Sequence, residues 1–265
     1  MSRLFIFRPL HFLMATTPRQ AAIFLNALLR TRQIKDDSKN GLQHDAKRPV
    51  ERIAFAVDAC AASFQKARAE GADLIVVHHG LLWKKEKTTP LLRRRISFLL
   101  KNKISLYACH LPLDAHPVLG NNAVMCAALG VSNRKKFGDY HGVFCGFSGE
   151  ISATTVQDLA RQVQGVVGPS SNPKIFQFNN RKIRRIGIVS GGASFVLEEA
   201  GRKKLDCVVI GEFKHGAFHD AEELGISVIE AGHYWTETLG VKALMPVLEK
   251  KLGVKTVFVE SPTGL

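Results

Sequence analysis

Two adjacent histidines, His78 and His79, end an apolar segment in the first third of the chain. The four residues before them, Leu74–Val77, are apolar without alternation, which is typical of a strand covered on both faces. Open α/β sheets bind ligands at the carboxyl ends of such strands. Because successive residues of an extended segment point in opposite directions, the two imidazoles suit two metals, or one metal and a supporting residue, better than a single chelate. The alternative is that the two histidines only cap a strand.

Two more histidines end strand-like segments, and each is followed four residues later by a carboxylate. His110 precedes Asp114, and His233 precedes Glu237, more than one hundred residues further along. Imidazole and carboxylate groups are both metal ligands, so we expect ligating side chains from both halves of the chain. Because ligands usually have a supporting partner, we expect His110 to orient Asp114, with a role as a sixth ligand as the alternative.

The elements that position these residues occur twice. Residues 53–80 predict a strand, a helix and a strand, and residues 186–215 predict the same order. Each unit is followed by a helix and by one of the strands that ends in a histidine. This repeat indicates an α/β fold of two similar domains from an internal duplication, with a dinuclear metal site in the cleft between them. The predicted units are residues 1–13 as a leader or misassigned start, residues 14–130 with 233–265 as the first α/β domain, and residues 131–232 as the second.

The second repeat carries further polar residues near the position of the His-His pair. We expect Glu212 to be a polar pocket residue. His215 and His219 have the i, i+4 spacing of helical metal ligands, which makes His215 a candidate for substrate contact or proton transfer. The turn Ser190–Gly192 either offers backbone N–H groups to an anion or is a plain tight turn. The candidate catalytic residues are therefore Glu212, His215 and His110.

Composition narrows the class of protein. The chain has 265 residues, of which 46% are hydrophobic, but no run of eighteen apolar residues that would predict a membrane span. Its five cysteines are scattered without a CxxC motif, which favours a reducing compartment over a disulfide scaffold or zinc ribbon. We therefore expect a cytoplasmic protein without a membrane partner.

The first 13 residues are basic and partly apolar, but Arg8 and Pro9 interrupt them, unlike the core of a signal peptide. Met14 leads directly to Thr17 and Pro18, a typical helix cap and first helical residue. We therefore expect Met14 to be the initiator.

The formal net charge is +14 at pH 7, and the basic residues are clustered. The clusters are Lys84–Lys87, Arg93–Arg95, Arg134–Lys136, Arg181–Arg185 and Arg202–Lys204. Such clusters indicate either a solvated surface or a surface that attracts nucleic acid or a phosphorylated substrate. The sequence contains no helix-turn-helix, RNP or zinc-finger pattern, which argues against specific nucleic-acid recognition.

Four motifs carry a resemblance to a known family. They are GADLIVVHHGLLWK, HLPLDAHPVLGNNAVMCAALG, the NGLQ of residues 40–43, and GHYWTETLGVKAL. These motifs, in this order, resemble the NIF-three-like family of dinuclear metal-centre proteins, whose bacterial members are often labelled GTP cyclohydrolase I type 2 homologue. The resemblance extends from Met14 to Glu260. The short link around Gly142–Ser170 leaves no room for the domain inserted in larger members, so the chain resembles the compact form.

The resemblance implies two divalent metal ions per chain. It implies the ligands His78, His79, Asp114, His233 and Glu237, with the carboxylate of Glu237 bridging. Three histidines and two carboxylates suit zinc, iron, manganese or cobalt. So few protein ligands for two metals leave positions for water, as in catalytic sites.

The resemblance also implies an assembly, a toroidal homohexamer built as a trimer of dimers. Two classes of function follow. The first is a metal-dependent hydrolase that acts on a nucleotide or another phosphorylated substrate, of which opening of GTP is one version. The alternative is a metal-containing binding or scaffold protein that associates with DNA.

Overall fold

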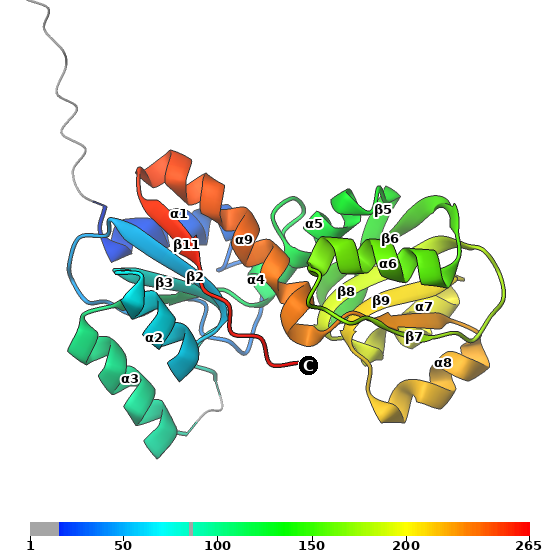
Figure 1. Cartoon of the computed structure of the whole chain (residues 1–265), viewed down its shortest axis with the longest axis horizontal. Helices are drawn as coiled ribbons and strands as arrows, with labels where there is room; N and C mark the ends of the chain where they lie inside the picture. Colours follow the sequence, from blue (N-terminus) through cyan, green and yellow to red (C-terminus); the bar gives the residue numbers. More distant parts are fainter. Residues whose placement is uncertain (1–15, 85–86) are drawn as a thin grey trace, which may run out of the picture.

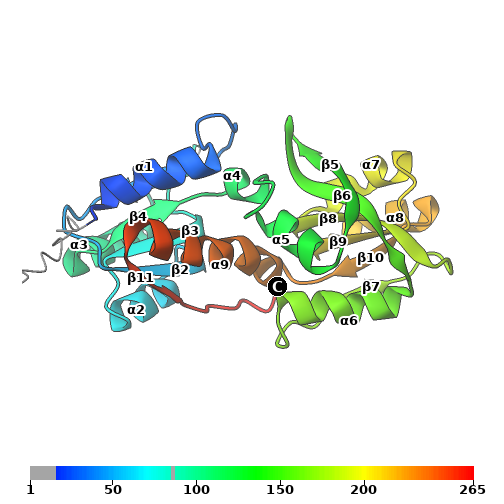
Figure 2. The ribbon, with the colours of Figure 1, turned by 90° about the horizontal axis from the view of Figure 1, so that it is seen from above.

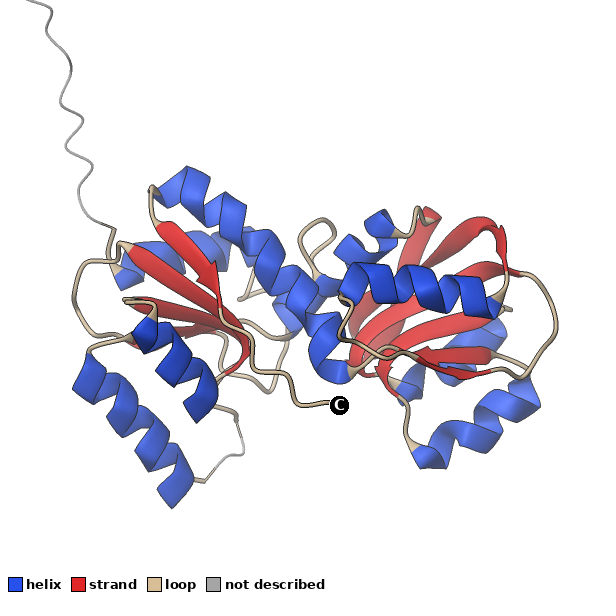
Figure 3. Cartoon of the chain, viewed as in Figure 1, coloured by secondary structure: helices blue, strands red, loops and turns tan. Residues whose placement is uncertain are grey.

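The computed structural model describes residues 16–84 and 87–265, which form two α/β halves joined by one long helix (Figure 1). Each half is a mixed β-sheet with helices on both faces (Figure 3). The mixed α/β class is therefore confirmed. The predictions about residues 1–13 and Met14 lie outside the described residues. Within the described parts of the chain, no helix is long and apolar enough to cross a membrane.

The first sheet has the strand order β1-β4-β3-β2-β11. Its strands are β1 (Gly41–His44), β2 (Arg52–Asp58), β3 (Leu74–His79), β4 (Ser105–Ala108) and β11 (Lys255–Phe258). All neighbours are parallel except β1 and β4, which run antiparallel. Consecutive side chains of β2 and β3 point to opposite faces of the sheet, and both sets are buried. This explains why the two strands are continuously apolar.

Helices cover the two faces of this sheet in pairs. Helices α1 (Pro18–Leu29) and α9 (His233–Leu252) pack on one face, and α2 (Ala61–Ala69) and α3 (Pro90–Asn102) pack on the other (Figures 1 and 2). Helix α1 begins with a capping box in which Thr17 and Gln20 satisfy each other's backbone N–H groups.

The second sheet has the strand order β5-β6-β8-β9-β10-β7. Its strands are β5 (Ser132–Tyr140), β6 (Val143–Thr154), β7 (Lys174–Phe176), β8 (Ile183–Gly192), β9 (Cys207–Glu212) and β10 (Ser227–Glu230). Strands β8, β9 and β10 are parallel, whereas β5, β6 and β7 pair antiparallel. Helices α5 (Asn121–Ala128) and α6 (Val156–Val167) pack on one face, and α7 (Leu197–Arg202) and α8 (Phe218–Leu224) on the other.

Each half contains a run of three parallel strands separated by helices, β2-β3-β4 in the first and β8-β9-β10 in the second. These runs correspond to the two predicted strand–helix–strand units, and their origin by duplication stays a prediction. We interpreted segment 142–170 from the sequence as a short link, and this was wrong, because the segment forms strand β6 and helix α6. Helix α9 packs in the cores of both halves, with Val241 and Leu244 in the first and Leu239 in the second.

Candidate metal centre

The polar side chains of interest lie where parallel strands end. In the first sheet, Asp58 ends β2, His79 ends β3 and His110 follows β4. In the second sheet, Glu212 ends β9, and α9 begins at His233 directly after β10. The carboxyl ends of parallel strands meet at one edge of a sheet, and these two edges lie against each other.

Glu237 is the centre of the resulting cluster. Its Oε2 lies 3.3 Å from Nε2 of His79, and its Oε1 lies 3.2 Å from Nε2 of His233 and 3.6 Å from Nε2 of His78. Asp114 Oδ2 lies 3.4 Å from the same nitrogen of His78. The structure thus brings together all five residues that the sequence predicts as ligands. Two sets of three, one of them with His110, have nitrogen or oxygen atoms close enough to hold a metal ion.

Four histidines of the cluster share one arrangement: Nδ1 meets an oxygen of the protein, which leaves Nε2 for the centre. The pairs are His78 with Cys109 O at 3.0 Å, His79 with Asp58 Oδ1 at 2.9 Å, His110 with Asp36 Oδ1 at 3.0 Å, and His233 with Glu212 Oε2 at 3.1 Å. An oxygen partner holds the proton on Nδ1 and fixes the ring, so that Nε2 presents a lone pair. This is the arrangement that metal-ligating histidines need.

We expected His110 to orient Asp114, but its ring has another partner. Its ring nitrogen bonds to Asp36 rather than to Asp114, and its ring centroid lies 5.1 Å from that of His78. The carboxylate of Asp114 is instead held at Oδ1 by Asn121 at 2.8 Å and by the hydroxyl of Ser190 at 3.0 Å. The ring of His110 donates its Nδ1–H to the carboxylate of Asp36, and His110 lies as a third imidazole beside His78.

Asp36 organises the loop before β1. Its carboxylate accepts hydrogen bonds from the ring of His110, from the backbone N–H groups of Leu111 and Ser38, and from the amide of Asn40. Burial alone would raise its pKa, but the hydrogen bond and charge of His110, with the Asn40 and Ser38 donors, lower the pKa to about 2. The carboxylate therefore stays charged and holds His110 in place.

The charges inside the centre stabilise one another. Burial opposes a charge on His78, but the carboxylates of Asp114 and Glu237 raise its pKa to about 10. The hydrogen bond to Glu237 is the largest cause that raises the pKa of His233 to about 9. Burial also opposes the charge of Glu237, and the neighbouring imidazoles of His79, His78 and His233 hold its pKa well below the usual range. In the metal-free protein, protonated imidazoles therefore supply the positive charge that faces the buried carboxylates, and a bound metal ion would displace these protons.

Two buried atoms of the centre lack a hydrogen-bond partner among the described residues: Nε2 of His78 and Oε2 of Glu237. A buried polar atom without a partner is costly. A divalent cation between these two atoms would give each of them a partner and would supply the positive charge that the carboxylates need. The donor set therefore fits a metal ion.

Gly191, the second-last residue of strand β8, makes room for the centre. A Cβ atom at this position would lie 2.4 Å from Oε1 of Glu237 and 3.2 Å from Nε2 of His233, and the residue has a φ of +68°. The N–H groups of Ser190 and Gly191 bond to Asn122 and Thr236, so they are not free for an anion. Ser190–Gly192 are the last residues of strand β8, so the expected turn, whether plain or anion-binding, was wrong.

The remaining candidate residues, Glu212 and His215, differ in whether they contact the centre. Glu212 orients His233, consistent with a polar residue of the pocket. His215 is exposed, and no hydrogen bond or ion pair within the described ranges connects it to the centre. His215 lies in a 3₁₀ turn before α8, while His219 pairs with Glu222 on that helix, so the two do not form an i, i+4 ligand pair. The substrate-contact or proton-transfer role expected for His215 stays a prediction.

We did not identify Asp36 and Asp58 as residues of the centre from the sequence. Asp58 is the residue of β2 paired with His79 on β3, so the register of parallel strands was a signal that could have found it. Asp36 lies four residues before the NGLQ motif, in a segment without periodicity, and only the folded loop shows its contact with His110.

Comparison with known proteins gives one consistent result. The model of the Duf34/NIF3 (NGG1p interacting factor 3) family matches residues 17–263. A Pyrococcus horikoshii protein named GTP cyclohydrolase 1 type 2 homolog is 46% identical over 91% of this chain and 97% of its own length. An Archaeoglobus fulgidus protein of the same name is 42% identical over 91% of this chain and 97% of its own. A crystal structure of a Thermus thermophilus protein superimposes with a TM-score of 0.84 at 37% identity, covering 94% of this chain and 100% of that one.

The family match covers nearly all of the described residues, and the relatives align over almost their whole lengths. The chain therefore belongs to the Duf34/NIF3 family.

Proposed function

We propose that the protein is a dinuclear-metal-dependent hydrolase that acts on a nucleotide or another phosphorylated substrate. The observation that carries this proposal is the convergence of three Nε2 atoms, those of His78, His79 and His233, on two buried carboxylates, with each Nδ1 already held by an oxygen. The name GTP cyclohydrolase 1 type 2 homolog, which the relatives bear, supports a nucleotide as the substrate. Sites with positions left for water usually do chemistry rather than only stabilise a fold.

The contacts suggest how two ions would be shared. His78 lies against Asp114 and Glu237, whereas His79 and His233 lie against Glu237. Glu237 is thus the residue common to both groups, and we assign it the bridging position. Three imidazoles and two carboxylates suit zinc, iron, manganese or cobalt. When bound, such ions supply Lewis acidity and lower the pKa of water.

The protein's own residues hold this arrangement rigid. Asp58 and Glu212 fix the rings of His79 and His233 from outside the cluster. Asn121 and Ser190 occupy Oδ1 of Asp114, so that Oδ2 is the oxygen directed at His78. In the proposed reaction, the oxygen of water bonds to the phosphorus of a phosphoester or to a ring carbon of the substrate. The P–O bond to the leaving alcohol, or the C–N bond of the ring, breaks, and a proton from the water passes to the departing oxygen or nitrogen.

Replacement of Glu237 by Gln tests the proposal. The amide is nearly the same size but lacks the charge, so the variant should lose at least one metal per chain and its metal-dependent hydrolysis of nucleotides. Glu249→Gln is a matched control, because Glu249 is an exposed residue of the same helix. Elemental analysis should give two metals per chain for the wild type and the control. A Glu237→Gln protein that keeps both metals and full hydrolysis would disprove the assignment.

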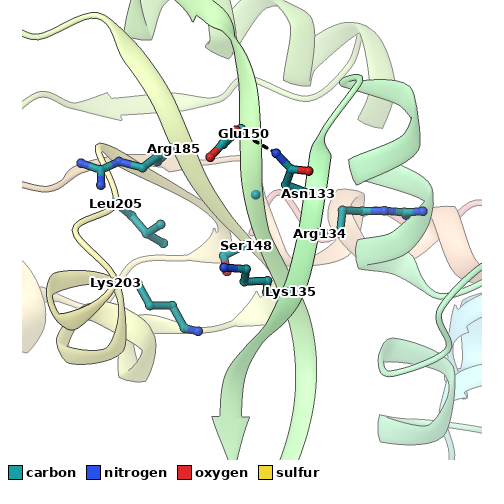
Figure 4. Close-up of a pocket in the computed structure, with 9 residues that line it drawn as sticks. Asn133, Arg134, Lys135, Ser148, Glu150, Arg185, Lys203 and Leu205 are labelled. Atoms are coloured by element: carbon teal, nitrogen blue, oxygen red, sulfur yellow. Dashed lines mark hydrogen bonds between the residues drawn. The ribbon is translucent and has the colours of Figure 1, made fainter.

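A second function has an observation in its favour. Three of the predicted basic clusters meet at a concavity of about 670 Å³ in the second half (Figure 4). Its cationic side chains are Arg134, Lys135, Arg185 and Lys203. Arg185 lies six residues before Gly191 on β8, so the concavity is about 20 Å from the metal centre at 3.3 Å per residue. Such a surface suits the phosphates of DNA, as the scaffold alternative requires.

Binding of duplex DNA as a function of salt tests this alternative. Contacts to phosphates give a slope of roughly −0.9 in log affinity against log salt for each phosphate neutralised. Lys135→Glu with Arg185→Glu should abolish binding, whereas Lys250→Glu, an exposed change at the far end of α9, should not. DNA binding that is equal in all three proteins would exclude this surface.

The assembly stays a proposal from the family resemblance. We infer a homohexamer built as a trimer of dimers, and sedimentation velocity at micromolar concentration should give a single species of six chains. A monomer would contradict it.

A further inference from the structure

A second cavity, of about 500 Å³, opens beside the metal centre. Its lining comes from both halves of the chain and includes His110 of the cluster. The residues that matter here, called the aromatic pocket, are Lys35, Trp83, Lys84, His110, Tyr140 and His141. Ligand pockets for small organic molecules are typically about 300–1,000 Å³, so this cavity has room for one.

Trp83 forms a fixed aromatic wall. Its ring centroid lies 5.1 Å from that of His110 and 6.4 Å from that of His79. The indole N–H donates to the carbonyl of Gly80 at 3.1 Å, and the Trp83 backbone makes an antiparallel bridge to Ser38. Because the indole N–H is already used, the half-buried ring offers the pocket only its apolar surface.

Tyr140 brings a second ring from the other half. It ends β5, pairs with Val143 on β6, and is followed by the two-residue turn His141–Gly142. Both turn residues have positive φ, +52° and +88°, as a type I′ hairpin requires. This tight turn presents Tyr140 rigidly, and the residue is still 42% exposed although its ring contacts Phe195 at a centroid distance of 5.3 Å.

The pocket also carries cations. The cations are Lys35 and Lys84, and the lining also includes the acidic Asp36 and Asp37. The carboxylate of Asp36 already accepts hydrogen bonds from four donors. The Lys84 Nζ lies 3.6 Å from Asp37, but both side chains are more than half exposed, and such surface pairs are weak. An anionic group of a ligand can therefore replace Asp37 as the partner of Lys84.

We propose that the aromatic pocket binds the substrate's planar heterocycle on Trp83 and Tyr140 and its phosphate at Lys35 and Lys84. This inference rests on the proposed hydrolase function, for which it names the substrate class: a nucleotide rather than a phosphate ester without a ring. His110 is shared between the pocket and the centre, so a ligand held there lies next to the metal-binding side chains.

Tryptophan fluorescence tests the proposal without requiring turnover. The chain has two tryptophans, and Trp235 packs in the core of the second half, so Trp235→Phe leaves Trp83 as the only reporter. Titration of this metal-loaded protein with GTP should quench the emission, because a stacked base contacts the indole. Tripolyphosphate, which has no ring, should leave the emission unchanged at concentrations where GTP saturates it.

Replacement of the two walls gives the second part of the test. Removal of one base–aromatic stack costs roughly 5- to 150-fold in affinity, so Tyr140→Leu should weaken GTP binding by that factor. Tyr140→Phe keeps the ring and should bind GTP like the wild type. Lys84→Met should weaken GTP and tripolyphosphate alike.

The outcomes separate this inference from the proposed function. Quenching of Trp83 by GTP, with no hydrolysis of GTP, of other nucleotides or of simple phosphate esters, supports the pocket and disproves the hydrolase. Hydrolysis of a simple phosphate ester, with no quenching by GTP and no loss in Tyr140→Leu, overturns the pocket and leaves the hydrolase standing. Equal quenching by tripolyphosphate also overturns it, because the ring would then contribute nothing.

Discussion

Gly191→Ala is the sharpest perturbation of the centre, because it leaves every proposed ligand in place. The added Cβ would lie 2.4 Å from Oε1 of Glu237, whereas real contacts of a Cβ essentially never fall below 3.0 Å. The backbone at Gly191 is held by Thr236, so the carboxylate must retreat by at least 3.0 − 2.4 = 0.6 Å. Metal–ligand distances tolerate deviations of only about 0.2 Å.

The change also has a backbone cost that must be separated from the effect on the carboxylate. An alanine in the left-handed region loses about 1–2 kcal/mol of unfolding free energy. Gly71 is a matched control, since its φ is +70° against +68° for Gly191, and a Cβ there meets nothing within 4 Å. Gly71→Ala should therefore lose the same stability without touching the centre.

The assay is competition with a chelator, alongside urea unfolding of the metal-free proteins. We expect both variants to lose about 1–2 kcal/mol of unfolding free energy. Only Gly191→Ala should lose metal affinity, on the order of 10- to 100-fold, as when a partner that supports a ligand is removed. Equal metal affinity in the two variants would refute the position of Glu237 as the central ligand.

Three further variants test the support of the centre and the core of the first half. Asp58→Asn removes the charge that holds His79, so metal affinity should fall by on the order of 10- to 100-fold in chelator competition; an unchanged affinity would contradict the orienting role. Phe64→Ala should cost about 3–5 kcal/mol in urea unfolding, because Phe64 is fully buried, while metal content per folded chain stays unchanged; a smaller loss would contradict its place in the core. The lowered pKa of Asp36, about 2 against 3.8, gives stability that is fully present above pH 3.8 and is lost as the pH falls toward 2; metal-free wild type should therefore lose about 2 kcal/mol more than Asp36→Asn over this window, and parallel losses would contradict it.

Much of the centre could be predicted because its ligands follow buried parallel strands. A continuous apolar run that ends in a histidine indicates both the strand and the side of the sheet where its side chain emerges, which applies to His79 and His110. His233 and Glu237 could be predicted for another reason. They are four residues apart at the start of a helix, so their side chains lie on one face of it. Local patterns were enough for these residues.

The supporting residues depend on contacts between distant segments, and local patterns do not contain them. Asp36 reaches His110 across 74 residues, and Ser190 reaches Asp114 across 76. The hairpin of β5 and β6 was not predicted, because its strands carry many exposed polar residues and little apolar alternation. That hairpin is what brings Tyr140 to the aromatic pocket.

The central claim is that the clustered histidines and carboxylates hold two divalent ions. Crystals of the metal-loaded protein, measured on both sides of the absorption edge of the metal found by elemental analysis, test it most directly. We expect two anomalous-difference peaks per chain, one beside His78 and Asp114 and one beside His79 and His233, both in contact with Glu237. A single peak, or two peaks of which neither contacts Glu237, would contradict it.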